Sequence, residues 1–193
     1  MPEFLLYYPF IVSLAAAAIA GASAFLLRRA ALTLGRWLWW PSWAASAGST
    51  AGFVWSFSWA WGLESNPVSG SQVLLVVIGW AAVLGGVALG LWGLSALGPR
   101  ALLPQPGDRL ETRPPYRQLR RPMALGAILA GLGASLIVET PAAWLCYLTW
   151  LVMASLLQEL EEWELRGRVP AAREYHSRTP RYLPRRRRAT QTK

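Results

Sequence analysis

The stretch from Met123 to Leu157, MALGAILAGLGASLIVETPAAWLCYLTWLVMASLL, decides the fold because a short polar turn joins two apolar runs in it. Each run has 16 residues, and Glu139-Thr140-Pro141 separates them. A helix of that length is about 24 Å long at ~1.5 Å per residue, which is short for a hydrocarbon core of ~30 Å. We therefore predict a helical hairpin that begins at Pro122 and whose second helix continues into Gln158–Leu165.

Three longer apolar runs precede this hairpin: Phe4–Leu27, about Ser42–Leu63 and about Gln72–Leu94. Each is long enough to cross a bilayer as a helix. Hydrophobic residues make up 54% of the 193 residues and charged residues only 15%, against roughly 25% charged in soluble proteins. The 12 Trp also suit a chain with two membrane interfaces. We predict an all-α membrane protein with about five transmembrane helices, the last two forming the hairpin.

Small and hydroxyl side chains in the longer runs predict close helix contacts. In the third run a stripe of small residues suits the near approach of a neighbouring helix; it consists of Gly79, Ala82, Gly86 and Gly90. The Ser side chains of the second run can donate to carbonyls of their own helix or to a neighbouring helix. We interpret both features as packing rather than as a site.

The basic residues all fall on one side of the membrane when five spans are counted. Three Arg lie between the first two spans, six lie between the third and fourth, and ten basic residues follow the fifth. The other connections and the N-terminus carry only the acids Glu64, Glu139 and Glu3. The positive-inside rule then places the N-terminus outside and the C-terminal segment in the cytosol.

Composition also argues against several classes of function. The net charge of +9 could suit nucleic acid. The basic residues, however, flank spans or lie in the tail, where they would orient the protein in the membrane and bind anionic lipid, so we expect no nucleic acid partner. Arg185–Arg188 should bind anionic headgroups at ~1 kcal/mol per charge. Cys146 is the only cysteine, so neither an internal disulfide nor a thiolate metal site is expected. His176, the only histidine, is expected to be solvated. The apolar spans contain no interior acids that could relay protons or ions, which argues against a transporter.

Two polar segments of the cytosolic side must meet if the last two helices form a hairpin. One is the Arg- and Pro-rich connection 98–121, and the other is an acidic group at the end of the fifth helix, which consists of Glu159, Glu161, Glu162 and Glu164. Charge at membrane depth is costly and often functional. Together the segments could bind a zwitterion, with Arg on its carboxylate and Glu on its ammonium. The alternative is that they pair only with each other.

These segments carry two ordered motifs. The first reads Leu110-x-Thr112-x-Pro114-Pro115-Tyr116-Arg117-x-x-Arg120-Arg121-Pro122-Met123-Ala124-Leu125-Gly126, and the second reads Glu161-Glu162-x-x-Leu165, then Tyr175, then Thr179-Pro180-Arg181-Tyr182-Leu183-Pro184. They resemble the L-x-T-x-G-P-Y-R-x-x-R-H-P-M-Y-x-G and E-E-x-x-L…Y…V-P-R-x-x-P patterns of the isoprenylcysteine carboxyl methyltransferase and phospholipid methyltransferase family. Each motif alone is weak, but both in order around a hairpin are more specific, and the resemblance covers about residues 85–184.

The resemblance implies S-adenosylmethionine as methyl donor and a lipophilic acceptor that enters from the bilayer. The residues implied for the cofactor lie on the family motifs; they are Tyr116, Arg117, Arg120, Arg121, Pro122, Met123, Gly126, Glu161 and Glu162. Glu161 or Glu162 would hold the ammonium, Arg120 would hold the carboxylate, and a ring such as that of Tyr116 would offer a π face to the sulfonium. No catalytic residue is identifiable. A prenylated cysteine, a phospholipid amine, a quinone-like ring and a small thiol all remain possible acceptors.

The chain departs from the family pattern at three positions of the first motif. The family's His is Arg121, its Tyr is Ala124, and its Gly is Pro114. Some bacterial relatives also have Ala at the Tyr position and a residue other than His, and we expect a bacterial inner membrane protein. The rival hypothesis is a non-catalytic member of the same fold, a structural or lipid-binding subunit of a membrane complex. The predicted parts are the N-terminal spans 1–97, a methyltransferase-like region 98–184 and a basic tail 185–193.

Overall fold

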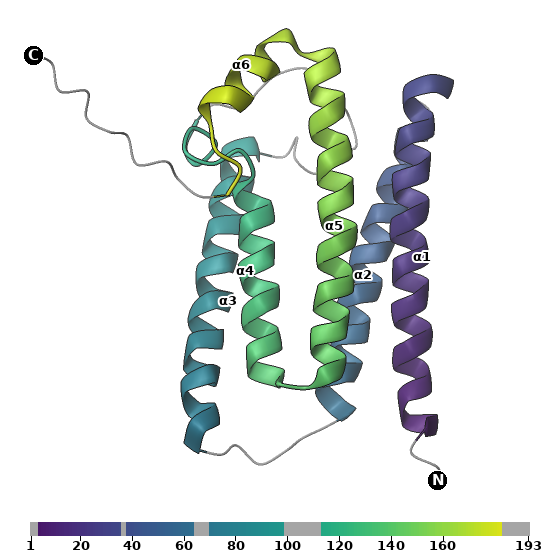
Figure 1. Ribbon diagram of the computed structural model, residues 1–193, viewed down its shortest axis with the longest axis vertical. Helices are drawn as coiled ribbons and strands as arrows, with labels where there is room; N and C mark the ends of the chain where they lie inside the picture. The colour runs from purple at the N-terminus through teal and green to yellow at the C-terminus, as the bar shows by residue number, and fades with distance from the viewer. Residues whose placement is uncertain (1–3, 36–37, 64–69, 99–112, 183–193) are drawn as a thin grey trace, which may run out of the picture.

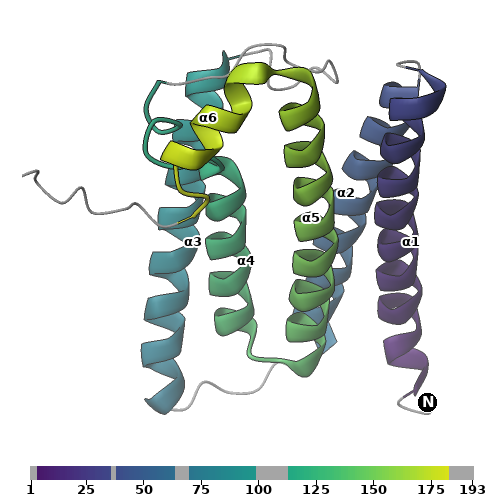
Figure 2. The same ribbon diagram turned by 45° about the horizontal axis from the view of Figure 1, so that its top comes forward.

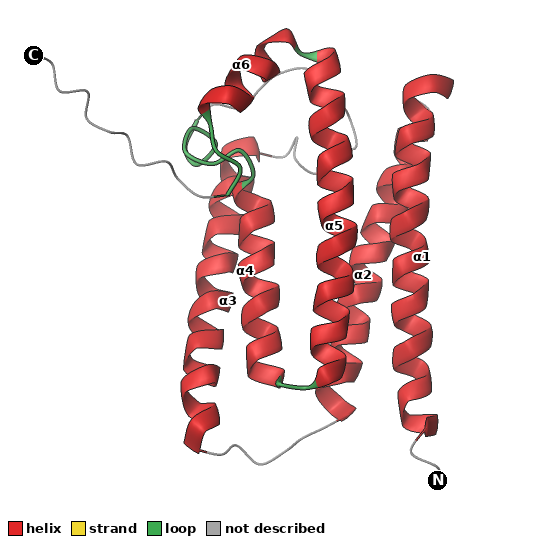
Figure 3. Ribbon diagram, in the orientation of Figure 1, coloured by secondary structure: helices red, strands yellow, loops and turns green. Residues whose placement is uncertain are grey.

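The described part of the chain folds entirely into helices and connecting loops (Figure 3). The structure is a computed structural model that describes residues 4–35, 38–63, 70–98 and 113–182. Its helices are α1 Phe4–Leu34, α2 Trp39–Leu63, α3 Gly70–Leu97, α4 Pro122–Val138, α5 Pro141–Arg168 and α6 Pro170–Arg178. The predicted all-helical fold is confirmed for these residues.

The long helices form two pairs with α5 between them. α1 packs along α2, α3 packs along α4, and α5 contacts α1, α2 and α4. The start of α1 and the α4–α5 turn lie at one end of the bundle, whereas the end of α5 and the short helix α6 lie at the other (Figures 1 and 2). This arrangement brings the loop before α4 to the same end as the last turns of α5.

Three of these helices are long and apolar enough to cross a membrane. The segments are Tyr7–Ala31, Gln72–Leu97 and Pro141–Gly167, while α4 is apolar but shorter. Large apolar side chains such as Leu26, Ile78 and Leu145 are exposed on these helices, as expected for surfaces that lipid would cover. These features indicate an integral membrane protein, and the count of five spans stays a prediction.

The α4–α5 turn has the signals that end one helix and begin the next. Glu139 ends α4 in the left-handed conformation at a φ of 54°, and its N–H donates to Ser135 O. Thr140 caps α5, because its side chain accepts a hydrogen bond from Ala143 N at 3.1 Å, and Pro141 occupies the first turn. The predicted hairpin is confirmed, and α5 continues without a break past the predicted Leu165.

The α1–α2 contact repeats every seven residues. Ala17, Ala24 and Ala31 are buried on α1, and Ser42, Ser49 and Ser56 are buried on α2. The Ser hydroxyls bond across the interface, Ser42 Oγ to Ala24 O at 3.0 Å, Ser49 Oγ to Ala17 O at 2.8 Å and Ser56 Oγ to Ser13 Oγ at 2.9 Å. Other hydroxyls of α2, such as Ser46 Oγ, donate to their own helix. Both bonding modes expected from the sequence are therefore present.

The α3–α4 contact depends on glycine instead. A Cβ added at Gly86 would lie 2.4 Å from Gly126 O, and one added at Gly79 would lie 2.8 Å from Gly133 O. A methyl group at either position would meet the backbone of the other helix. The predicted small-residue stripe of the third span is thus confirmed as a packing surface.

Candidate functional site

Three segments of the chain meet at the end of the bundle that holds α6. The loop 113–121, the last turns of α5, and α6 with the residues after it are joined by hydrogen bonds: Arg120 N donates to Pro180 O at 2.9 Å, Tyr175 Oη to Tyr116 O at 2.6 Å, and Tyr182 Oη to Gln158 Oε1 at 2.8 Å. The meeting of the Arg-rich loop with the acidic end of the fifth helix, predicted from the hairpin, is confirmed.

Around this junction lies a charged cluster, the name used below for nine side chains. They are Glu159, Glu161, Glu162 and Glu164 with Arg28, Arg120, Arg121, Arg166 and Arg181, all joined by salt bridges. Charges this close to the apolar part of a membrane protein are costly unless each is paired. The two polar segments pair with each other in the structure, and this pairing agrees with both expectations from the sequence, a zwitterion site and pairing alone.

Glu162 is the centre of the charged cluster. Its side chain is only 3% exposed. Its Oε1 accepts from Arg121 Nε at 3.3 Å and Arg181 Nε at 2.9 Å, and its Oε2 accepts from Arg120 Nη1 and Arg166 Nη2, each at 3.1 Å. A carboxylate has about four lone-pair sites. These four bonds use all of them.

Glu161 is held more loosely. Its side chain is 39% exposed. Its Oε1 accepts from Arg28 Nη2 at 3.3 Å and its Oε2 accepts from Arg121 Nη1. No other donor among the described residues bonds to this carboxylate, so two of its lone-pair sites can accept further donors.

Arg121 stands where the family pattern has His, and its charge is compensated. Its guanidinium bonds to both Glu161 and Glu162, and its Nη2 donates to Gln158 O at 2.9 Å. Arg120 bonds to Glu162 through Nη1, but its Nε is buried and has no hydrogen-bond partner within the part of the chain that the structure describes. An unsatisfied buried donor on a charged group is unusual in a stable fold.

Two residues near the cluster gain definite roles. Arg181, part of the second motif, bonds to Glu159 and Glu162, and the hydrogen bond with Glu159 is the main reason that its pKa is raised. His176 is half-buried rather than solvated, and its Nδ1 accepts from Arg166 Nε at 3.2 Å. Burial is the main cause that lowers the pKa of His176, which favours the neutral ring that can accept at Nδ1.

Arg28 of α1 was not expected at the site. The predicted first run ends at Leu27, but α1 continues to Leu34 and holds Arg28 on a helix beside α5. There Arg28 Nε donates to Glu164 Oε1 at 3.1 Å. The sequence offered no signal for this contact, because Arg28 and Glu164 are 136 positions apart.

The remaining predicted cofactor residues lie beside the cluster rather than in it. Pro122 is buried at the start of α4, Met123 Cγ would lie 2.7 Å from a Cβ at Gly93, and a Cβ at Gly126 would lie 2.5 Å from Gly86 O. These contacts with α3 account for Met123 and Gly126 without a cofactor. Arg117 is exposed, and Tyr116 takes part through its carbonyl; its predicted π contact stays a prediction.

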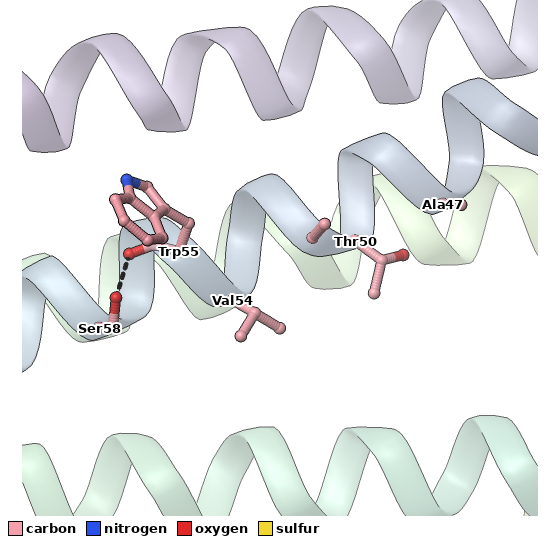
Figure 4. Close-up of a pocket in the computed structure, with 6 residues that line it drawn as sticks. Ala47, Thr50, Val54, Trp55 and Ser58 are labelled. Atoms are coloured by element: carbon pink, nitrogen blue, oxygen red, sulfur yellow. Dashed lines mark hydrogen bonds between the residues drawn. The ribbon is translucent and has the colours of Figure 1, made fainter.

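A separate open depression lies on the middle of α2 (Figure 4). Its lining consists of Ala47, Thr50, Ala51, Val54, Trp55 and Ser58. Two hydroxyls in it bond to their own helix, Thr50 Oγ1 to Ser46 O at 3.0 Å and Ser58 Oγ to Trp55 O at 2.7 Å. Its lining contains no ionisable side chain.

The fold and the charged cluster define a class of protein. It is a helical membrane protein whose charged side chains gather at the end of the bundle opposite the α4–α5 turn (Figure 1). Residues 74–167 match the family model described as phospholipid methyltransferase, which confirms the resemblance that the motifs predicted. The match includes most of α3, the loop, α4 and almost all of α5, so it contains Arg120, Arg121, Glu161 and Glu162. It excludes Arg28 and Arg181. No curated protein and no solved structure matches the chain.

Proposed function

We propose that this protein is a membrane-integral, S-adenosylmethionine-dependent methyltransferase that acts on a lipid or another small lipophilic acceptor. The family match, which points to membrane methyltransferases, supports the reaction class. One observation carries the site: Glu161 and Arg120 lie in a single charged cluster at the open end of the hairpin, within the matched residues.

The residues of the cluster fit the amino-acid part of the cofactor. The two open lone-pair sites of the half-exposed Glu161 suit an ammonium group. The buried Nε of Arg120 suits a carboxylate oxygen, which would satisfy a donor that has no partner among the described residues. Because Glu162 is fully bonded, we assign it the role of anchoring Arg120 and Arg121 rather than of binding the ligand.

When bound, the cofactor would supply an electrophilic methyl group on a sulfonium, which the acceptor would displace in line with a neutral thioether as the leaving group. The residues of the chain then act by positioning and by excluding water, which can supply much of the rate. The fixed guanidinium of Arg120 and the carboxylate of Glu161 would orient the donor. An acceptor that is already an anion, such as a thiolate or carboxylate, needs no base, and the neutral His176 has its Nδ1 occupied by Arg166.

The proposed orientation has five spans, with the N-terminus outside and the charged cluster at the cytosolic surface. The charge distribution along the sequence supports it, because all nineteen basic residues then share one side. The acceptor would reach the cluster from the bilayer, and the basic tail would bind anionic headgroups. A bacterial inner membrane is the setting that we expect.

A second function is favoured by a specific observation. Arg121 replaces the family's His and is tied into both Glu161 and Glu162, and Ala124 replaces its Tyr. A cluster closed by its own salt bridges would suit a non-catalytic relative that serves as a structural or lipid-binding subunit. Such a protein would fold stably and bind no cofactor.

Binding of S-adenosylmethionine to the full chain in detergent separates the two functions. By isothermal titration we expect the wild type to bind and Glu161→Gln to bind roughly tenfold to hundredfold more weakly, because a hydrogen bond to a charged group is lost. The matched control is Glu174→Gln, since Glu174 pairs with Arg178 on the exposed surface of α6. No binding by the wild type at millimolar cofactor would refute the enzyme, and unchanged binding by Glu161→Gln would refute the site.

A further inference from the structure

Arg28 reaches the charged cluster from a part of the chain that lies outside the family match. It stands near the end of α1, on the first helical pair, and the match begins only at residue 74. Its side chain is 19% exposed. The next residue, Arg29, is exposed on the same helix. The two neighbours therefore have the same chemistry in different surroundings.

The guanidinium of Arg28 is fixed before it meets Glu161. Its Nε lies 3.1 Å and 3.3 Å from the two carboxylate oxygens of Glu164, whose side chain is 0% exposed. The guanidinium carbon also lies 5.0 Å from the centre of the Trp39 ring, a distance at which a cation is attracted to the ring face. A planar fork held on two sides loses little further freedom when it bonds a third group.

That third group is the carboxylate that the proposed function assigns to the ligand. Arg28 Nη2 donates to Glu161 Oε1, while Arg121 Nη1 donates to Glu161 Oε2. One cation thus comes from α1 and the other from the loop before α4. While both oxygens of Glu161 are bonded, the carboxylate cannot rotate and its two open lone-pair sites keep a fixed direction. A carboxylate held at one oxygen can rotate.

We propose that Arg28 is a positioning residue for Glu161, so that α1 completes a cofactor site whose other residues lie in the matched region. The inference rests on the proposed function, since it concerns the same carboxylate. Arg28 itself does not contact the cofactor; it sets the direction in which Glu161 accepts the ammonium. A purely structural Arg28, which only ties α1 to α5, is the alternative.

A double-mutant cycle distinguishes these roles. Isothermal titration of the full chain in detergent with S-adenosylmethionine is made on the wild type, Arg28→Ala, Glu161→Gln and the double variant. We expect Arg28→Ala to weaken binding roughly tenfold in the wild-type background and less than about twofold in the Glu161→Gln background. Arg29→Ala should bind like the wild type. Arg28→Lys keeps the charge but not the fork, so it should restore part of the affinity.

Each result decides the matter. Equal losses from Arg28→Ala in both backgrounds, or no loss in either, would overturn the positioning role while leaving the proposed function intact. A wild type that binds no cofactor would overturn the proposed function, and the inference with it. If Arg28→Ala does not fold, Arg28→Lys takes its place in the cycle, and equal losses in the two backgrounds would again overturn the role.

Discussion

The helix interfaces inside the bundle and the charged cluster at its end are held by opposite kinds of contact. Between α1 and α2, and between α3 and α4, small side chains recur at regular spacing, and each contact is weak. In the cluster a few strong charges from distant parts of the chain converge on Glu162. Packing inside the helix bundle therefore depends on the shape of small side chains, whereas the end of the bundle depends on the balance between carboxylates and guanidiniums.

The two helix pairs also differ from each other. α1 and α2 exchange hydroxyl-to-carbonyl hydrogen bonds, such as Ser49 to Ala17, while α3 and α4 bring backbones together at Gly86 and Gly126. In lipid there is little hydrophobic drive between helices, so both solutions use small residues to gain close contact or a hydrogen bond. Loss of a hydroxyl removes one bond, but a side chain added at Gly86 separates two backbones.

The largest effect is expected from Glu162→Gln. This isosteric change leaves four arginines around an uncharged amide, whose NH2 group donates and cannot accept. Removing one partner from buried charge pairs costs about 3–5 kcal/mol. Thermal unfolding of the purified protein in detergent should show a clear fall in Tm. The control Glu174→Gln, in an exposed pair, should leave Tm unchanged. Equal Tm values for the two variants would contradict a stabilising role for the cluster.

An intermediate effect is expected from Gly86→Ala. Its new Cβ would lie 2.4 Å from Gly126 O and 2.6 Å from Ala130 N, both backbone atoms that cannot move without parting α3 from α4. Overpacking of this kind costs about 1–3 kcal/mol. The neighbouring Gly85→Ala is the matched control, because a Cβ there meets nothing within 4 Å. The same Tm measurement checks both, and a stable Gly86→Ala with an unstable Gly85→Ala would reverse our assignment of the interface.

The smallest effect is expected from Ser49→Ala. It deletes one buried interhelical hydrogen bond of 2.8 Å to Ala17 O, and such bonds between membrane helices are worth about 0.6 kcal/mol on average. Ser58→Ala removes an exposed hydroxyl whose bond, within the described part of the chain, is to Trp55 O of its own helix, and it should change Tm less. A loss from Ser58→Ala as large as that from Ser49→Ala would show that the interhelical bond adds nothing.

Much of the helix bundle could be predicted from the sequence, because local patterns of residues determine where its long helices form. Apolar runs long enough for a bilayer form helices, since backbone groups in lipid must bond within their own segment. Pro122 and Glu139-Thr140-Pro141 place both ends of α4 and the start of α5. The small-residue stripe around Gly86 marks a contact surface before its partner is known. Only the partner, α4, had to come from the structure.

The site could be predicted in part. The hairpin alone requires that the loop containing Arg120 and Arg121 meets Glu161 and Glu162, and the structure confirms that meeting. The sequence could not separate the two glutamates, which are adjacent and identical in type. Their difference is a matter of surroundings, because four arginines fill the lone pairs of one and two leave the other half open.

The sequence by itself determined the five long helices and the hairpin, and it predicts the side of the membrane to which the charges belong, because hydrogen bonding, apolar length and charge order are properties of neighbouring residues. It did not predict α6. Only the tertiary structure decided which cation meets which carboxylate. Arg28 bonds to Glu161 across 133 positions, and no local pattern encodes that distance. Charges act through space, so the chain had to fold before α1 and α5 could share them.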